Sequence, residues 1–202
     1  KRDWSSDVCS SDRLTPELDD FRRQLEQLSA DGSRLVGDMS DDEFNWRPAP
    51  DRWSIAQCIE HLNATAREYL PALDECIADA IRRGQYGAGP FRYTLVGRLV
   101  ARSQEPPARL KFKSPRAFAP PDRRGRQETM AAFRAYQVQY IDRLRQANGL
   151  DLSRARVRST AYRWLRIPLG SAFALTTAHE RRHLWQARQV LDALQSARAA
   201  GA

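Results

Sequence analysis

The sequence predicts an all-α protein that folds as a four-helix bundle. Four long segments of the 202-residue chain repeat apolar residues at the three- and four-residue spacing of a helix face. Helix start and stop signals stand at the ends of these segments. No segment alternates polar and apolar residues over a length that would predict a sheet, and the chain has no internal repeat.

The first predicted helix begins at Thr15-Pro16-Glu17. The threonine hydroxyl is placed to cap the helix, proline suits the first helical position, and acidic residues follow in the first turn. An apolar stripe continues at helical spacing with Leu18, Phe21, Leu25, Leu28 and Leu35. The stretch SDDEFNWRPAPDRW comes later, with two prolines between two tryptophans, and we predict that it is a loop.

The second predicted helix begins after Ser54. Gln57 stands three residues later, so the two residues form a capping-box pattern. The apolar stripe of this helix consists of Ile55, Ile59, Leu62, Tyr69, Leu73 and Ile77. We expect the helix to end near Gly84.

Residues 84–125 form an unusually long connection. Glycine and proline interrupt them, and only Tyr93–Ala101 could form a short helix. Connections longer than about 12–15 residues are uncommon in compact domains. A crossover that runs the length of the bundle would explain this one, because parallel neighbouring helices need a long return.

The third predicted helix runs from about Gln127 to Asn148, where Asn148-Gly149 is a good C-terminal stop. Its inward residues are Met130, Phe133, Tyr140, Ile141 and Leu144. A second irregular stretch follows. The fourth helix then begins near Gly170 and continues to about Ala197.

Length and composition indicate one soluble domain over residues 13–202. Residues 1–12 are polar, lack periodicity and lack the apolar centre of a signal peptide, so we expect a non-native or disordered leader. No apolar run approaches the roughly 20 residues of a membrane span, so we expect no membrane partner. Three cysteines without a CxxC pair, and no export signal, favour a cytoplasmic location.

The formal net charge is +8, and almost all of the positive charge is arginine. The arginines are scattered along predicted helices and loops, which favours solvated faces over a nucleic-acid interface. We therefore expect no nucleic-acid partner. The most basic region, Arg102 to Arg126, stays open as an anion-binding patch.

The only three histidines of the chain form a candidate metal site. His179 and His183 are four residues apart, so on a helix both imidazoles project from one face. The same face continues with Thr176, Ala187, Val190 and Leu194, which indicates that the pair points into the bundle. His61 lies between inward residues of the second helix and can reach the same interior. Buried imidazoles without partners cost free energy, and a shared cation removes that cost.

Two alternatives to this site stay open. The histidines could be unrelated, since an HxxxH spacing also arises by chance. The letters HERRH also fit the HExxH motif of zincin proteases, in which the glutamate is the general base. Only about 20 residues follow the motif, no downstream third ligand is present, and no substrate-aligning sheet is predicted. Protease therefore remains the minor alternative.

The stretch LVGDMSDDEFNWRPAPDRWSIAQCIEHLNATAREYLPAL and the later AHERRHLWQARQV resemble the DinB-like (YfiT-like, bacillithiol transferase-like) superfamily of four-helix metalloproteins. The resemblance rests on Trp53-Ser54, His61-Leu62, His179 and His183, and covers about residues 15–195. It implies an up-down-down-up bundle, often a homodimer. It also implies zinc or nickel held by His61, His179 and His183.

The resemblance also implies an activity, because relatives include bacillithiol transferases and mycothiol-dependent maleylpyruvate isomerase. We expect a metal-dependent thiol S-transferase or isomerase that acts on a small-molecule substrate with a low-molecular-weight thiol. A metal suits this chemistry because coordination deprotonates a thiol. The alternatives are a metal-dependent hydrolase, which would use water activated at the metal, and a non-catalytic metal-binding or stress-response module.

Residues around the histidines have two interpretations each. Gln57 either orients His61 or faces the pocket, or it only caps its helix. Cys58 is a fourth ligand or, as we favour, a small buried core residue. For Glu180 we favour a surface ion pair with an arginine, because its side chain leaves the helix about 100° from that of His179.

The remaining candidates are aromatic and basic. We expect the tryptophans to pack the bundle ends, although any of them could line a pocket: Trp46, Trp53, Trp164 and Trp185. Arg47 and Arg52 flank the prolines of the predicted loop. They could bind an anionic cofactor, but we favour a plain surface role for each.

Overall fold

The structure is a computed structural model that describes residues 13–91, 93, 102–107, 120, 122–160 and 164–201. The four predicted helices are all present: α1 (Pro16–Val36), α3 (Ile55–Arg82), α5 (Arg126–Gln146) and α6 (Leu169–Gly201). The described connections also contain the short elements α2 (Asp41–Asn45), β1 (Arg156–Arg158) and β2 (Arg166–Pro168). The predicted leader, residues 1–12, lies outside the described residues. So does the short helix considered at 93–101, except for its first residue.

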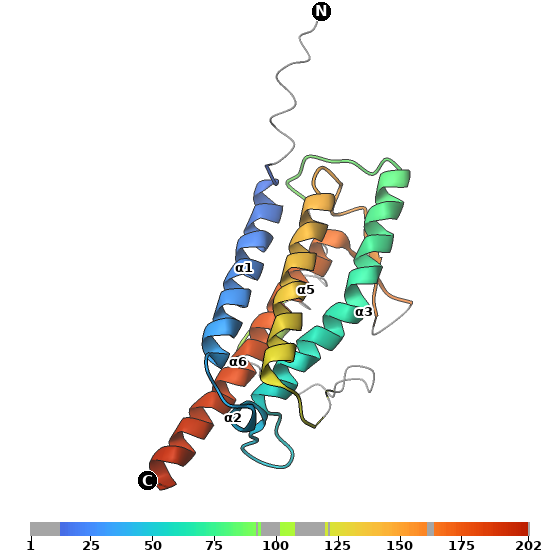
Figure 1. The fold of residues 1–202 in the computed structure, drawn as a ribbon. Coiled ribbons are helices and arrows are strands. Elements are labelled where there is room, and N and C mark those ends of the chain that lie inside the picture. Colours follow the sequence, from blue (N-terminus) through green and yellow to red (C-terminus); the bar gives the residue numbers. More distant parts are fainter. Residues whose placement is uncertain are drawn as a thin grey trace, which may run out of the picture.

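The four long helices form an up-down-down-up bundle, as the resemblance implied. In Figure 1, α1 and α6 run in one direction, and α3 and α5 run side by side in the other. Each of α1 and α3 packs against both α5 and α6, so α1 and α3 lie diagonally opposite each other. Because α3 and α5 are parallel, the chain has to return along the whole bundle between them, which confirms the predicted crossover.

The starts of α3 and α1 differ: α3 has a side-chain cap, and α1 does not. Ser54 and Gln57 form the predicted capping box of α3: the Ser54 hydroxyl accepts the Gln57 backbone N–H at 3.1 Å, and the Gln57 side chain accepts the Ser54 N–H at 3.1 Å. Thr15 differs from the prediction, because its buried hydroxyl makes no capping hydrogen bond. Instead, its backbone N–H donates to Asn148 Oδ1. The threonine thus joins the start of α1 to the turn after α5.

The predicted loop before Trp53 contains the short helix α2. Ser40 and Glu43 form a second capping box at its start. Phe44 is completely buried and fixes this turn against the bundle. The same loop also occupies Arg47, whose guanidinium donates to the backbone carbonyls of Pro50 and Arg52. This favours a structural role for Arg47.

The sequence showed no alternation that would predict a sheet, but the described residues include one short two-stranded ribbon. β1 and β2 pair antiparallel, with Val157 opposite Ile167 and Arg158 opposite Arg166. Each strand has only three residues, so the alternation is too short to stand out in the sequence. Val157 is fully buried between two exposed arginines and anchors the ribbon to the bundle.

The buried apolar residues form two clusters along the bundle. The first includes Leu18, Phe21, Leu73, Leu144 and Val157, and the second includes Leu35, Phe44, Ile59, Phe133 and Ala187. A set of buried polar side chains, which we call the polar layer, belongs to neither cluster: His61, Asn63, Gln137, Glu180 and His183. No helix in the described part of the chain is long and apolar enough to cross a membrane.

Candidate metal centre

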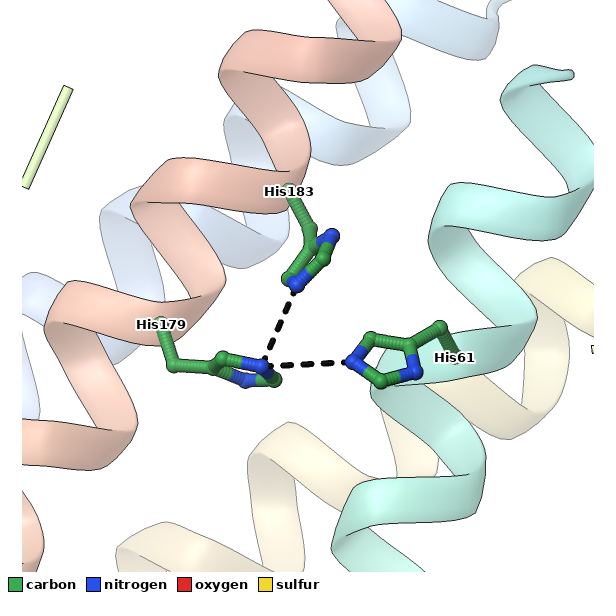
Figure 2. A group of neighbouring side chains, drawn as sticks. All are labelled: His61, His179 and His183. Carbon is green, nitrogen blue, oxygen red and sulfur yellow. Dashed lines mark hydrogen bonds between the residues drawn. The ribbon is translucent and has the colours of Figure 1, made fainter. Parts of the chain in front are cut away.

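The structure brings the three histidines together in the bundle interior. His61 comes from α3, and His179 and His183 come from successive turns of α6 (Figure 2). His61 and His183 are buried, while His179 is partly exposed. The predicted stripe of α6 is also buried, namely Thr176, Ala187, Val190 and Leu194. The capping box at Ser54 fixes the start of α3 two turns before His61 and thereby sets the position of its imidazole.

The three Nε2 atoms converge on one point. His179 Nε2 lies 3.3 Å from His61 Nε2 and 3.1 Å from His183 Nε2 (Figure 2). Two nitrogens bound at about 2.0–2.1 Å to one tetrahedral metal lie about 3.3 Å apart. The spacing therefore fits three nitrogen ligands of a single ion. In the described part of the chain, these are the residues that could hold one.

Hydrogen bonds alone do not account for this convergence. An imidazole nitrogen carries either one hydrogen or one lone pair in the ring plane. His179 Nε2 therefore satisfies at most one of its two histidine neighbours. A shared cation accepts all three lone pairs at once.

The surroundings keep the histidines in the neutral form that binds metals. Burial, together with the neighbouring His61 and Arg182, lowers the pKa of His179 to about 3. Burial, together with the other two histidines and Arg182, also holds the pKa of His183 well below its usual value. Since neutral imidazole is the ligand form, no proton has to be removed before binding at neutral pH.

The second ring nitrogen of His183, Nδ1, is also in a state that fits a metal bound at Nε2. His183 Nδ1 and the Gln186 side-chain oxygen are both buried and have no well-formed hydrogen bond. The two groups interact weakly, which raises the pKa of His183 slightly against the lowering by burial. Coordination through Nε2 requires the tautomer with a hydrogen on Nδ1, and this N–H would supply the donor that the Gln186 oxygen lacks. In the sequence, this contact is indicated by the i, i+3 spacing of His183 and Gln186, which places the two residues on one face of the helix.

Trp53 lies against the histidines. Its ring centroid is 5.2 Å from that of His61 and 5.8 Å from that of His183, and it stacks on His183 at an interplanar angle of 24°. Trp53 thus lines the site. Trp46 packs against the second apolar cluster, whereas Trp164 is 82% exposed, so the prediction that it packs a bundle end is wrong.

Two further candidates are drawn away from the histidines. The Gln57 side chain is occupied by the capping box. Cys58 is buried in the second apolar cluster, where burial raises the pKa of its thiol to about 12. Both residues therefore have structural roles, and Cys58 does not join the converging nitrogens.

The prediction for Glu180 is wrong. Its carboxyl is buried and accepts a hydrogen bond of 3.0 Å from the Gln137 side chain on α5. Burial raises the pKa of Glu180 to about 7, against the lowering effects of Gln137 and Arg181. The carboxylate is directed to α5, so it does not serve the histidines as the zincin glutamate serves its metal. The spacing along the helix predicts the direction in which the Glu180 side chain leaves α6. It does not indicate that α5 packs over this side of the helix.

Part of the crossover packs beside the histidines on α6. Arg181 forms a two-bond ion pair with Glu105, at 2.9 and 2.5 Å, and also donates to Gln24 on α1. The buried Arg182 donates to the Ser103 carbonyl at 3.4 Å. The crossover therefore keeps a positive charge close to the site. Residues 108–119 and 121 of the predicted anion patch lie outside the described part.

Comparisons with known proteins identify the family and the fold of the chain. The family model of the DinB superfamily matches residues 24–187. A similar solved structure is that of YfiT from Bacillus subtilis, described as a probable metal-dependent hydrolase with an unusual four-helix bundle topology. It shares 14% sequence identity, covers 91% of each chain and has a TM-score of 0.58. A search of curated proteins found no significant match. The match to the family model spans most of the sequence, including all three histidines, and the chain belongs to the DinB superfamily.

Proposed function

We propose that the chain binds one divalent ion, zinc or nickel, through His61, His179 and His183, and that it is a metal-dependent thiol S-transferase or isomerase. The observation that carries the proposal is the convergence of the three Nε2 atoms, with separations of 3.1 and 3.3 Å from His179. Three protein ligands are the number typical of catalytic rather than structural zinc sites. Such an ion lowers the pKa of a coordinated thiol or water.

The surrounding residues suit an anionic reactant. Arg182 is buried beside the histidines, and its positive charge favours a thiolate over a thiol there. Trp53 covers two of the imidazoles and limits the access of water. Low water content strengthens these electrostatic interactions. We propose a small-molecule substrate together with a low-molecular-weight thiol; a cytoplasmic homodimer remains our prediction from the sequence.

The second candidate is a metal-dependent hydrolase, and the description of YfiT favours it. The same three histidines would serve both activities. Glu180, the residue that a zincin would use as general base, is bound to Gln137 instead. A hydrolase built on this site would therefore depend on a different base.

The first experiment measures bound metal. The protein is purified without chelators or a histidine tag and analysed by mass spectrometry, beside a His179→Ala/His183→Ala variant. We expect about one zinc or nickel ion per chain in the wild type and none in the variant. A Gln189→Ala variant on the exposed side of α6 is the matched control and should retain the metal. Wild-type protein that stays metal-free after reconstitution would contradict the site.

The second experiment distinguishes the two activities. The metal-loaded protein is assayed with a panel of low-molecular-weight thiols and an electrophile, and in parallel with esters and amides. Thiol conjugation that disappears in the double histidine variant supports the transferase. Ester or amide turnover without thiol dependence supports the hydrolase and overturns the transferase.

A further inference from the structure

A cleft of about 580 Å³ lies at the other end of α3 from the histidines. One wall is the last part of α3, with Cys76, Asp79 and Arg83, and the other wall is the ribbon β1–β2. His61 stands in the second turn of α3, and the lining of the cleft begins at Ala72, so helical rise places the two about 16 Å or more apart. The cleft is therefore separate from the candidate metal centre.

Three arginines of the ribbon share its solvent face. Arg156, Arg158 and Arg166 are exposed and line the cleft. The register places Arg158 directly opposite Arg166. Residues opposite each other on a ribbon have their Cβ atoms about 5 Å apart, and like charges there are destabilising. Within the part of the chain that the structure describes, none of these three guanidiniums has a carboxylate within ion-pair distance.

The acidic residues on the facing wall are already neutralised by other arginines. Asp79 pairs with Arg82 and Arg83 at 2.9 Å, and Asp74 pairs with Arg143 at 2.8 Å. The third carboxylate that lines the cleft is Glu75, which is exposed. The lining holds five arginines and three carboxylates, a net charge of +2.

The charge of the ribbon reaches into the cleft. Burial raises the pKa of the Cys76 thiol to about 11, and the positive charge of Arg166 acts against this rise. Arg166 and Cys76, from opposite walls, both line the cleft. An anion seated there would meet Arg166 and its cross-strand neighbour together.

We propose that this cleft is a binding site for a small phosphate-bearing anion, which Arg158 and Arg166 hold between them with Arg156 beside them. The planar guanidinium matches two oxygens of a phosphate at once. A dianion balances the net charge of the lining, and it removes the repulsion between the two opposed arginines.

The test titrates the metal-loaded protein with inorganic phosphate in an isothermal calorimeter at low ionic strength. The test variant is Arg158→Gln/Arg166→Gln. The control is Arg23→Gln/Arg34→Gln, which removes two exposed arginines from α1 and leaves the cleft intact. We expect phosphate to bind the wild type and the control equally, and the test variant at least tenfold more weakly.

Thermal unfolding gives a second readout that also checks the fold. Without phosphate, the test variant should unfold at the wild-type temperature or above, since a repulsion is removed. Phosphate should raise the unfolding temperature of the wild type but not that of the variant. Equal affinity in all three proteins, or no binding by the wild type, overturns the proposal. So does binding that a chelator abolishes and the test variant retains, because it places the phosphate at the histidines.

Discussion

His179 and Glu180 are adjacent in the sequence, but their side chains leave α6 about 100° apart. The imidazole therefore faces α3, whereas the carboxyl faces Gln137 on α5. One oxygen of Glu180 and the side-chain oxygen of Gln137 remain buried without a partner. Both are acceptors while Glu180 is ionised, and protonation would give Glu180 a donor. The protonated form therefore suits this buried pair of oxygens, and it is also the form that burial favours when it raises the pKa of the carboxyl.

The raised pKa predicts a pH-dependent stability. In the folded chain the pKa of Glu180 is about 7, against an ordinary value of 4.5, so the folded state holds a proton that the unfolded state has lost. The free energy of unfolding therefore falls as the pH rises from about 4.5 to about 7. Glu180→Gln removes this loss. Measured by urea unfolding with a chelator present, its gain over wild type should be about 2–3 kcal/mol larger at pH 8 than at pH 5.

The difference in the free energy of unfolding between the wild type and Glu180→Gln reports on Glu180 alone. The pKa values of His179 and His183 are lowered, so their contributions to stability change with pH in the opposite direction and cancel in the comparison. Glu68→Gln, at an exposed position of α3, is the control and should show no such pH dependence. A gain independent of pH at position 180 would mean that the carboxyl is ionised throughout.

At the scale of elements, the cap at the start of α3 also determines where the following residues of this helix lie in the core. Ser54 is completely buried, and the helix that it begins brings Ile55, Ile59 and His61 into the core. The reciprocal bonds with Gln57 satisfy two backbone N–H groups at this end of the helix. The position of the first imidazole thus depends on a serine seven residues before it.

Ser54→Ala should lower the free energy of unfolding by about 1–2 kcal/mol, because it leaves the Gln57 N–H buried without its acceptor. Chemical denaturation of the metal-free protein measures this change. Ser196→Ala, in the exposed last turns of α6, is the matched control and should stay within about 0.5 kcal/mol of wild type. Equal effects at the two positions would show that the capping box contributes little.

The long helices were predictable because each buries one stripe of apolar residues against its neighbours. Apolar residues therefore recur at the helical spacing in the sequence. The short elements were not, since their signals are local. The strand around Val157 offers one inward residue between two arginines. The helix after Ser40 has a readable capping box, but the two later prolines suggested a loop. Once a helix lasts only five residues, no period exists to detect.

The histidines of the site were predictable for a different reason. Their spacing and their apolar neighbours fixed both the face and the depth of the side chains. The stacking of Trp53 and the bond between Glu180 and Gln137 depend on which helices are adjacent. Helix adjacency comes from the topology, and the sequence spacing within one helix does not contain it.

At the scale of the whole molecule, His61 and His183 belong to the polar layer, which neither apolar cluster includes, and the partly exposed His179 lies against both of them. An apolar core holds its helices by burial of surface, but this layer offers little such surface. A metal bound to His61, His179 and His183 would join α3 to α6 there. The site would therefore stabilise the bundle where its packing is least apolar.

Metal should accordingly raise the stability of the fold. For a ligand at 1,000 times its dissociation constant, the expected increase in the free energy of unfolding is about 4 kcal/mol. Thermal unfolding with zinc and with a chelator measures it in the wild type and in His183→Ala, which should show little or no difference between the two conditions. A similar shift in both proteins would place the stabilising metal elsewhere.

The parallel arrangement of α3 and α5 has a consequence for synthesis of the chain on the ribosome. Both helices that flank α1, and both that flank α3, belong to the second half of the sequence. The first half therefore emerges without the surfaces that its apolar stripes need. His61 leaves the ribosome well over 100 residues before His179, so the candidate metal centre forms only when the last helix has been made. Until then, the apolar stripes of the nascent first half lack their partners, and exposed apolar surface of this kind is prone to aggregation.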